Sequence, residues 1–243
     1  MKRKLKIEIG LAVLLLLIAL FGSFLAPYDP LKVNYDFSLQ SPSFLHIFGT
    51  DKLGRDVFSR ILCGAKTSFG LTFLMLFLIV FIGMIVGLIA GLSNDKVESF
   101  FNNIINGLLA FPDTIFAIAI VGIVGAGLFN TVFALALIWW TKYARLTLAL
   151  VKQEKKKNYL VISKMSGVPP LQRVIRYLLP NILSQILVTT FLDIGNMMIS
   201  LAGLSFLGLA SQPPQPEWGA MLYESKQFMQ VAPWMMFFPG LVL

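Results

Sequence analysis

Long apolar runs alternate with polar segments along this chain of 243 residues. Runs of this length predict membrane-spanning helices, five complete and a sixth incomplete. We place them at residues 7–26, 68–92, 104–128, 131–151, 182–209 and 232–243. As a helix the last run reaches about 18 Å, well short of the roughly 30 Å of a crossing. The pattern predicts an all-α polytopic membrane protein with one transmembrane domain at 7–243, preceded by a cytoplasmic segment at 1–6.

The composition excludes a soluble protein. Apolar residues make up 57% of the chain and charged residues only 13%, which is more apolar surface than a soluble core buries. Basic loops explain the net charge of +8, so it requires no nucleic acid. Cys63 is the single cysteine and His46 the single histidine. These counts exclude an internal disulfide and a protein-only metal cluster of the usual His/Cys kind.

Basic residues set the expected orientation. Lysines and an arginine within 1–6 precede the first run and hold the N-terminus in the cytoplasm. A cleaved signal peptide is the alternative, but the run at 7–26 is long enough to span and is followed by a poor cleavage site. The loop at 152–181 is also basic, and we count Lys142 and Arg145 on its side of the membrane. Most of the Lys and Arg residues then lie inside.

The segment at 155–180, KKKNYLVISKMSGVPPLQRVIRYLLP, is longer and more basic than a turn requires. Leu160, Val161 and Met165 recur at roughly helical spacing, and Gly167 interrupts the pattern. We therefore predict a short amphipathic helix on the cytoplasmic side. It either receives a docked partner or lies on the lipid headgroups as a basic anchor, and the composition leaves both open.

Helix packing is partly predictable. Gly83, Gly87 and Gly91 stand four residues apart on one face of the second span. Small residues at this spacing allow another helix to approach closely. The alternative is that glycine is simply common in membrane helices.

Ionisable residues inside a span are costly unless they are paired or in contact with water. Asp193 lies well inside the fifth span, with Asn196 on the same helical face. Asp113 follows Pro112, which marks a helix break in the third span. Each polar residue either lines a translocation path or makes a structural hydrogen bond, and the sequence leaves both open. The sequence holds no catalytic set and no phosphate-binding loop, so uphill work would draw on another subunit or an ion gradient.

Three segments in order resemble one family. HIFGTDKLGRDVFSRILCGAKTS and GLSFLGLASQPPQPEWGAML are similar to segments of the inner-membrane permeases of peptide- and nickel-type ABC importers, in their second, GTDxLGRD-type permease. The basic loop stands where this family carries its EAA-type coupling motif, with Gly167 at the central glycine and Leu179-Pro180 at the closing Leu-Pro. Ile162 and its neighbours replace the Glu-Ala-Ala residues, and Tyr177 replaces a common isoleucine.

The resemblance implies a type I ABC importer permease fold that forms half of a translocation pathway. It implies no bound cofactor, with ATP used by partner subunits, and a place in the bacterial cytoplasmic membrane. The implied partners are a homologous second permease, two cytoplasmic ABC ATPases and an extracytoplasmic substrate-binding protein. The loop at 155–180 would contact the ATPases through Tyr159, Ser163, Lys164, Gly167, Leu179 and Pro180.

The resemblance also bears on the outer segments. Glu217 and Trp218 would contact the docked binding protein or guard the mouth of the pathway, with an interfacial anchor as the alternative for Trp218. In the GTDKLGRD segment we expect Asp51, Arg55 and Asp56 to form local ion pairs, in a structural role rather than in substrate contact. The family completes its sixth span and adds a short tail, so we expect the run at 232–243 to be truncated.

Cargo and mechanism have alternatives. WTKYARL at 140–146 and the segment at 192–209 look more like the nickel branch, so we expect nickel or a metal chelate, with short peptides as the alternative. An ion-gradient-driven carrier is the alternative of another class, but such carriers show internal repeats and more midplane charge. An intramembrane enzyme would need a catalytic set that the sequence does not contain.

Overall fold

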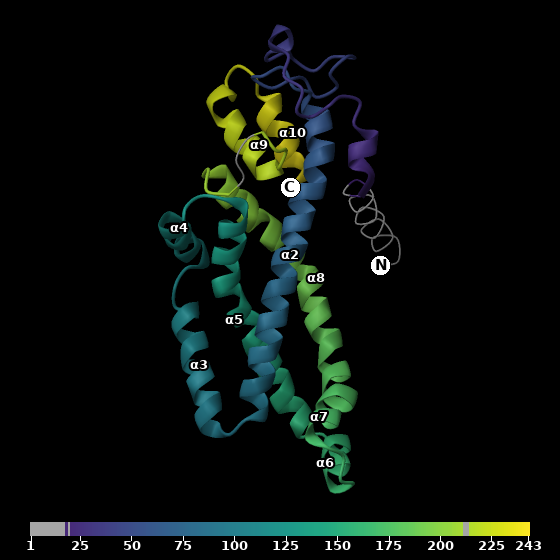
Figure 1. Cartoon of the computed structure of the whole chain (residues 1–243), viewed down its shortest axis with the longest axis vertical. Coiled ribbons are helices and arrows are strands. Elements are labelled where there is room, and N and C mark those ends of the chain that lie inside the picture. Colours follow the sequence, from purple (N-terminus) through teal and green to yellow (C-terminus); the bar gives the residue numbers. More distant parts are fainter. Residues whose placement is uncertain (1–17, 19, 211–213) are drawn as a thin grey trace. The chain divides into compact units, whose positions relative to one another are not determined.

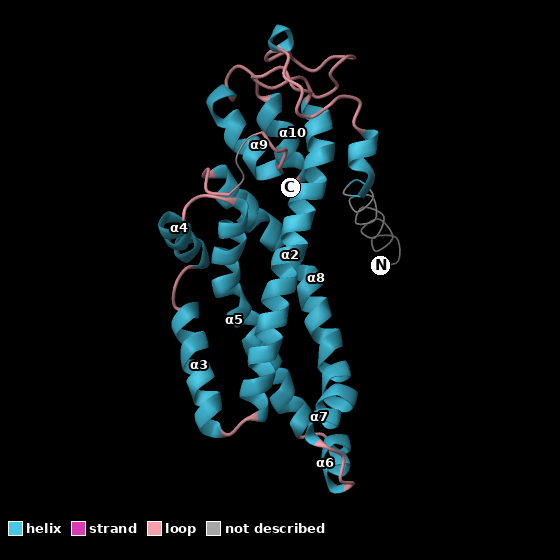
Figure 2. Cartoon of the chain, in the orientation of Figure 1, coloured by secondary structure: helices cyan, strands magenta, loops and turns pink. Residues whose placement is uncertain are grey.

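The computed structural model describes residues 18, 20–210 and 214–243. Helices are the regular elements of this part of the chain, and it contains no strand (Figure 2). The predicted cytoplasmic segment at 1–6 and most of the predicted span at 7–26 lie outside the described residues, although residues 20–25 are helical. The all-α prediction is confirmed for the described residues.

The chain divides into two compact units. Unit 1 holds the described residues of Met1–Thr72, Val124–Thr131 and Met198–Leu243, and unit 2 holds Phe73–Ile123 and Val132–Met197. Because one end of each long helix belongs to unit 1 and the rest of it to unit 2, we describe the packing within each unit separately.

Three helices are long and apolar enough to cross a membrane, counted over the residues that the structure describes. They are α2 (Val57–Leu92), α5 (Leu128–Lys155) and the run Pro170–Phe206, which includes α8 (Leu179–Phe206). A bent pair makes a fourth candidate if it counts as one span. The expected total of five complete spans and a partial sixth is therefore not confirmed. The last helix, α10 (Trp234–Val242), has 9 residues.

The predicted third span is not one straight helix. It consists of α3 (Asp95–Leu109) and α4 (Asp113–Val124), which are bent by 86°. The break predicted at Pro112 is present, because proline has no N–H for a helical hydrogen bond and constrains the residue before it. Asp113 then starts α4, and its carboxylate accepts a hydrogen bond from the Thr114 N–H at 2.7 Å.

The other spans differ from the predictions at their ends. α2 begins at Val57, well before the predicted residue 68, because the Asp56 carboxylate caps it by accepting the Ser59 N–H at 2.8 Å. α5 extends past both predicted ends, 131 and 151. α8 ends before the predicted residue 209, and Gly208 follows it with a φ of 81° that favours glycine.

In unit 2, α2 and α5 approach each other closely along the three glycines predicted for packing. A Cβ added at Gly83 would lie 2.6 Å from the Trp140 carbonyl oxygen, and one at Gly87 would lie 2.6 Å from the Ala144 carbonyl oxygen. At Gly91 the nearest atom, on a valine of α5, would be 2.7 Å away. These distances leave no room for a side chain, so glycine permits direct contact between the two helix backbones.

α3 lies alongside α5 within the same unit (Figure 1). Arg145 donates to the Asn106 side chain, and Lys152 forms an ion pair with Glu98. The two contacts join α3 to α5 at separate points along its length. They hold the amphipathic α3 to the bundle through its polar face.

In unit 1, α9 (Trp218–Ser225) and α10 lie beside the start of α2 (Figure 1). The ring of Phe48 stacks on that of Phe238 with 3.8 Å between centroids. The indole N–H of Trp234 donates to the Thr50 carbonyl at 3.1 Å. Short 3-10 turns at Tyr35–Phe37 and Lys226–Phe228 complete this unit.

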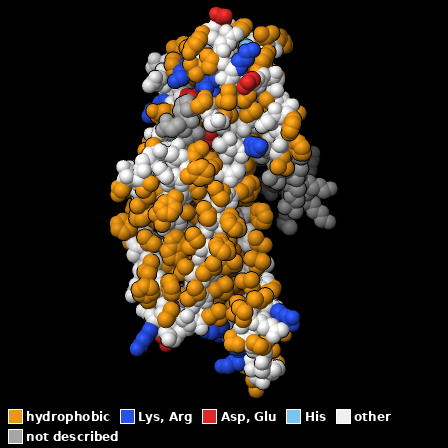
Figure 3. Space-filling view, in the orientation of Figure 1, with side chains coloured by type: hydrophobic (Ala, Val, Ile, Leu, Met, Phe, Trp, Pro, Cys, Tyr) orange, Lys and Arg blue, Asp and Glu red, His pale blue; other side chains and the backbone are white. Residues whose placement is uncertain are grey.

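The outer faces of the spans are apolar. Orange side chains cover the visible face of α2 and α8, and basic side chains appear near α6 and α7 (Figure 3). On α8, Phe191 and Leu192 are exposed by 69% and 75%. In a soluble protein such a surface would aggregate, whereas lipid or a partner helix covers it in a membrane.

The glycine contact predicts opposite outcomes for two alanine substitutions in α2. Gly87→Ala should lower the stability by about 1–3 kcal/mol, because the new methyl group has no space. Gly70→Ala is the matched control, because nothing lies within 4 Å of its Cβ position, and alanine favours the helix by up to about 1 kcal/mol. Thermal unfolding in detergent measures both. Equal midpoints for the two variants would contradict the contact.

Candidate functional site

The predicted cytoplasmic loop folds as two short helices and a wide turn. α6 (Asn158–Met165) follows α5 closely, α7 is Pro170–Arg173, and a π turn at Val174–Leu178 leads into α8. The Leu179 N–H closes this turn on the Val174 carbonyl. Pro180 cannot donate a backbone hydrogen bond, and a wide turn just before it suits that missing donor.

Gly167 ends α6 in the left-handed conformation, with a φ of 74°. Its N–H donates to the Lys164 carbonyl at 3.2 Å, and the next N–H donates to the Ser163 carbonyl at 3.1 Å. These bonds close the last turn of the helix. Nothing lies within 4 Å of its Cβ position, so the backbone conformation and not crowding favours glycine here.

The apolar face of α6 points away from the chain. Val161, Ile162 and Met165 are exposed by 47%, 60% and 83%. Lys164 is exposed beside them, whereas Ser163 is buried and donates to the Leu160 carbonyl at 2.8 Å. A helix that exposes apolar side chains in this way is suited to docking against another surface.

Glu154 fastens α6 to the end of α5. Its carboxylate accepts hydrogen bonds from the Tyr159 hydroxyl and from Lys157, the latter at 2.6 Å. Burial and the bond to Glu154 raise the pKa of Tyr159 to about 12, so the phenol keeps its proton and remains a donor. The sequence predicted Tyr159 in this site and missed Glu154, although it is the single acid of a basic segment.

Basic and apolar side chains surround a cavity of about 690 Å³ between α6, α7, the π turn and the ends of α2 and α5. Lys155, Lys164 and Arg173 supply its positive charge, and Val161 and Leu171 are among its apolar lining. Leu179 is half-buried and Pro180 exposed just beyond it. The structure thus brings the predicted coupling residues to one end of unit 2.

A second cluster lies in the middle of α5 and α8. The Lys142 ammonium contacts both carboxylate oxygens of Asp193, at 2.8 and 2.7 Å. The Tyr143 hydroxyl donates to one of them at 2.9 Å. Asp193 is therefore ion-paired and hydrogen-bonded within this chain, as the structural alternative predicted.

Lys142 corrects the sequence interpretation, which counted it on the cytoplasmic side. It lies about 20 Å from either end of α5, at 1.5 Å per residue, and so within the span. The sequence already indicated this placement, because Lys142 lies inside the predicted apolar run at 131–151.

Asn196 is exposed on the face of α8 that carries Asp193, and Asp113 is exposed at the start of α4. Asp113 lines a cavity with Lys142.

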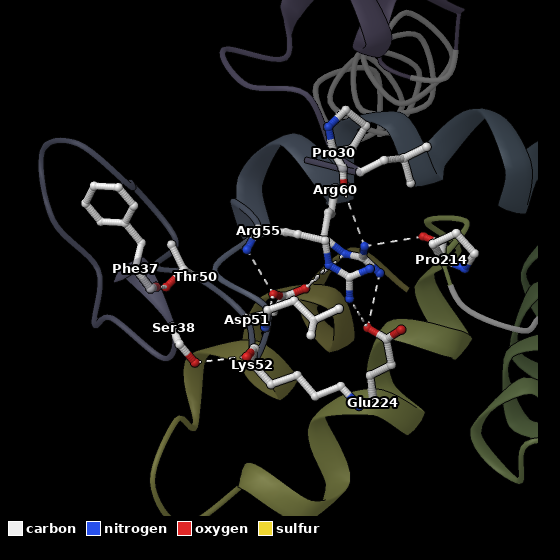
Figure 4. A network of polar contacts seen from close by, with 12 residues as sticks. Pro30, Phe37, Ser38, Thr50, Asp51, Lys52, Arg55, Arg60, Pro214 and Glu224 are labelled. Atoms are coloured by element: carbon white, nitrogen blue, oxygen red, sulfur yellow. Dashed lines mark hydrogen bonds and ion pairs between the residues drawn. The ribbon is translucent and has the colours of Figure 1, made fainter. Parts of the chain in front are cut away.

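Unit 1 contains a buried charge network (Figure 4). Arg55 contacts Asp51 at 2.6 Å and Glu224 at 2.9 Å, and Arg60 contacts the same two acids at 3.6 and 3.2 Å. Arg60 also donates to backbone carbonyls, including that of Pro214 at 3.4 Å. The expected local pair of Asp51 and Arg55 is confirmed, whereas Asp56 contacts His46 at 2.9 Å. Two positive and two negative groups balance, as burial of charge requires.

Glu217 and Trp218 were expected to contact a docked binding protein or to guard the mouth of the pathway, which requires exposed side chains. Each is exposed by only 1%. The Glu217 carboxylate caps α9 by accepting the N–H groups of Gly219 and Ala220 at 2.9 and 2.8 Å. The Trp218 indole donates to the Ile61 carbonyl at 2.9 Å. Because both side chains are buried, they fix α9 against α2 and reach neither a docked protein nor the lipid interface.

Several known proteins are similar in sequence to this chain. Residues 83–243 match the family described as binding-protein-dependent transport system inner membrane component. The chain is 35% identical over 230 residues to the nickel transport system permease protein NikC of Escherichia coli K12, covering 95% of this chain and 83% of the relative. It is 38% identical over 242 residues to the di/tripeptide transport system permease protein DppC of Pseudomonas aeruginosa, covering 96% and 80%. It is 39% identical over 232 residues to the glutathione transport system permease protein GsiD of Shigella flexneri, covering 95% and 77%.

The charge network predicts a large effect from one carboxylate. Glu224→Gln should lower the stability of the chain by about 3 kcal/mol, because Arg55 and Arg60 stay buried with less compensating charge. Asp36→Asn changes an exposed carboxylate of the same unit and should have little effect. Thermal unfolding in detergent compares the two. A Glu224→Gln midpoint equal to that of the control would show that the network contributes nothing.

Proposed function

This chain belongs to the family of binding-protein-dependent transport system inner membrane components, and we propose that it forms half of the translocation pathway of an ABC importer. It is a multi-pass membrane transport component, as its long apolar helices and its relatives indicate. The proposed partners are a homologous second permease, two ATPases and an extracytoplasmic binding protein. ATP would be used by the ATPase subunits, and this chain would bind no cofactor.

The exposed apolar face of α6 supports this function most strongly. Ile162 and Met165 are largely exposed and Val161 is about half exposed, while the Glu154 contacts fix the helix to α5. An apolar helix held in this way transmits movement of a docked ATPase to the spans as a rigid unit. The headgroup-anchor alternative requires no such fastening.

Orientation follows from the same loop. The basic residues of 152–181 support a cytoplasmic position for α6 and, with residues 1–6, a cytoplasmic N-terminus. The network of Arg55 and Glu224 would then lie on the outer side. Labelling of a Lys156→Cys variant from the outside, in a Cys63→Ala background, would contradict this orientation.

Nickel, as a chelate, and short peptides are both supported as cargo. The named relatives of nickel and peptide systems are similarly identical to this chain, at 35%, 38% and 39%. Among the described residues, no group of three or more His, Cys, Asp or Glu side chains could hold a metal ion.

Charge on the α6 face should uncouple the importer. Ile162→Asp combined with Met165→Asp should reduce uptake per ATP hydrolysed about tenfold, because a buried unpaired charge costs at least the 1.4 kcal/mol that corresponds to this factor. Ile162→Leu with Met165→Leu is the matched control, because it keeps an apolar face, and it should transport normally. Uptake and ATP hydrolysis are measured together in proteoliposomes. Wild-type coupling in the aspartate variant would show that α6 does not dock an ATPase.

A further inference from the structure

The cluster of Lys142, Tyr143 and Asp193 is unevenly exposed. The Asp193 side chain is exposed by 6%, whereas that of Lys142 is exposed by 47%. The carboxylate is thus enclosed within unit 2, and about half of the Lys142 side chain is open to the outside of the chain. Both residues lie about 20 Å from the ends of their 28-residue helices, which places the pair near the middle of the bilayer.

A half-exposed lysine side chain at this depth does not face lipid. A charged side chain in the hydrocarbon is costly, and such residues face the interior of an assembly or a water-filled path. The long Lys side chain could reach the interface only from near a helix end, and Lys142 is at the centre of its helix. Its face of α5 therefore borders the pathway or the partner permease.

The ammonium also has donor capacity left. Lys142 has three N–H donors, and the contacts to the two oxygens of Asp193 occupy two of them. Tyr143 holds Asp193 in place independently, through its own hydrogen bond at 2.9 Å. Lys142 can therefore accept a second anionic partner without leaving Asp193 unpaired.

The adjacent cavity has a matching charge pattern. It has a volume of about 240 Å³, and Lys142 and Asp113 supply its two ionisable side chains, with Phe111, Trp139 and Thr141 among the others. One cation and one carboxylate on an otherwise apolar wall complement a small molecule that carries charges of both signs.

We propose that Lys142 is a specificity-determining residue that binds a carboxylate of the cargo during passage. This inference rests on the proposed importer function and names its substrate class. Peptides and metal complexes of amino acids both carry such a carboxylate, so one contact serves either cargo. Asp193 and Tyr143 are positioning residues that hold the ammonium in place.

The test compares cargo pairs that differ in the carboxylate. Proteoliposomes holding the complete importer are given dialanine or dialanine amide, and separately nickel with glycine or nickel with ethylenediamine. The binding protein is the same throughout, so its own preference cancels when each variant is compared with wild type. Lys142→Met with Asp193→Asn removes both charges together and keeps an acceptor for Tyr143. Lys142→Arg keeps the charge, and thermal unfolding of each complex checks assembly.

We expect the double variant to slow uptake of the carboxylate-bearing cargo about tenfold or more, relative to uptake of the matched cargo that lacks the carboxylate. This is the effect of losing one charge-assisted hydrogen bond. Lys142→Arg should retain the discrimination. The affected pair, peptide or nickel, identifies the source of the carboxylate. Equal slowing of both members of each pair would overturn the inference, and so would unaltered uptake by the double variant. Wild-type complexes that take up none of the cargoes with ATP would instead refute the proposed importer function, and this inference with it.

Discussion

The close contact between α2 and α5 determines most of unit 2. Gly83 lies against Tyr143, whose hydroxyl holds Asp193. At the other end of the contact, Lys155 donates to the Gly91 carbonyl at 3.0 Å, one residue after Glu154, which fastens α6. One line of glycines thus places both the midspan ion pair and the helix proposed to dock an ATPase. A displacement of α5 along this contact would move both sites together.

In unit 1 the corresponding constraint is the balance of buried charge. Arg55 and Arg60 are exposed by only 1%, so their acids must be close and fixed. Glu224 comes from α9, distant in sequence, and Trp218 anchors the other end of that helix on α2. The segment resembling GTDxLGRD is therefore a structural element of this unit. Its charges join neighbouring elements and are not available to cargo.

Local features of the sequence were sufficient for part of this structure. The apolar runs predicted α2, α5 and α8, Pro112 predicted the break between α3 and α4, and the ordered motifs identified the family. Each of these depends on neighbouring residues or on a resemblance. The pairing of Lys142 with Asp193 depends on the register of two helices about 50 residues apart, which no local pattern contains. The burial of Trp218 likewise depends on α2, and Asp56 starts α2 early through a cap that hydropathy does not detect.

The importer assignment is tested most directly by the energy source for uptake. The complete complex, with the second permease, the ATPases and the binding protein, is reconstituted with and without this chain and given ATP or an imposed ion gradient. Uptake of the nickel chelate or peptide should require both ATP and this chain, and should not respond to the gradient. Uptake driven by the gradient in the absence of ATPases would contradict the assignment and favour a secondary carrier.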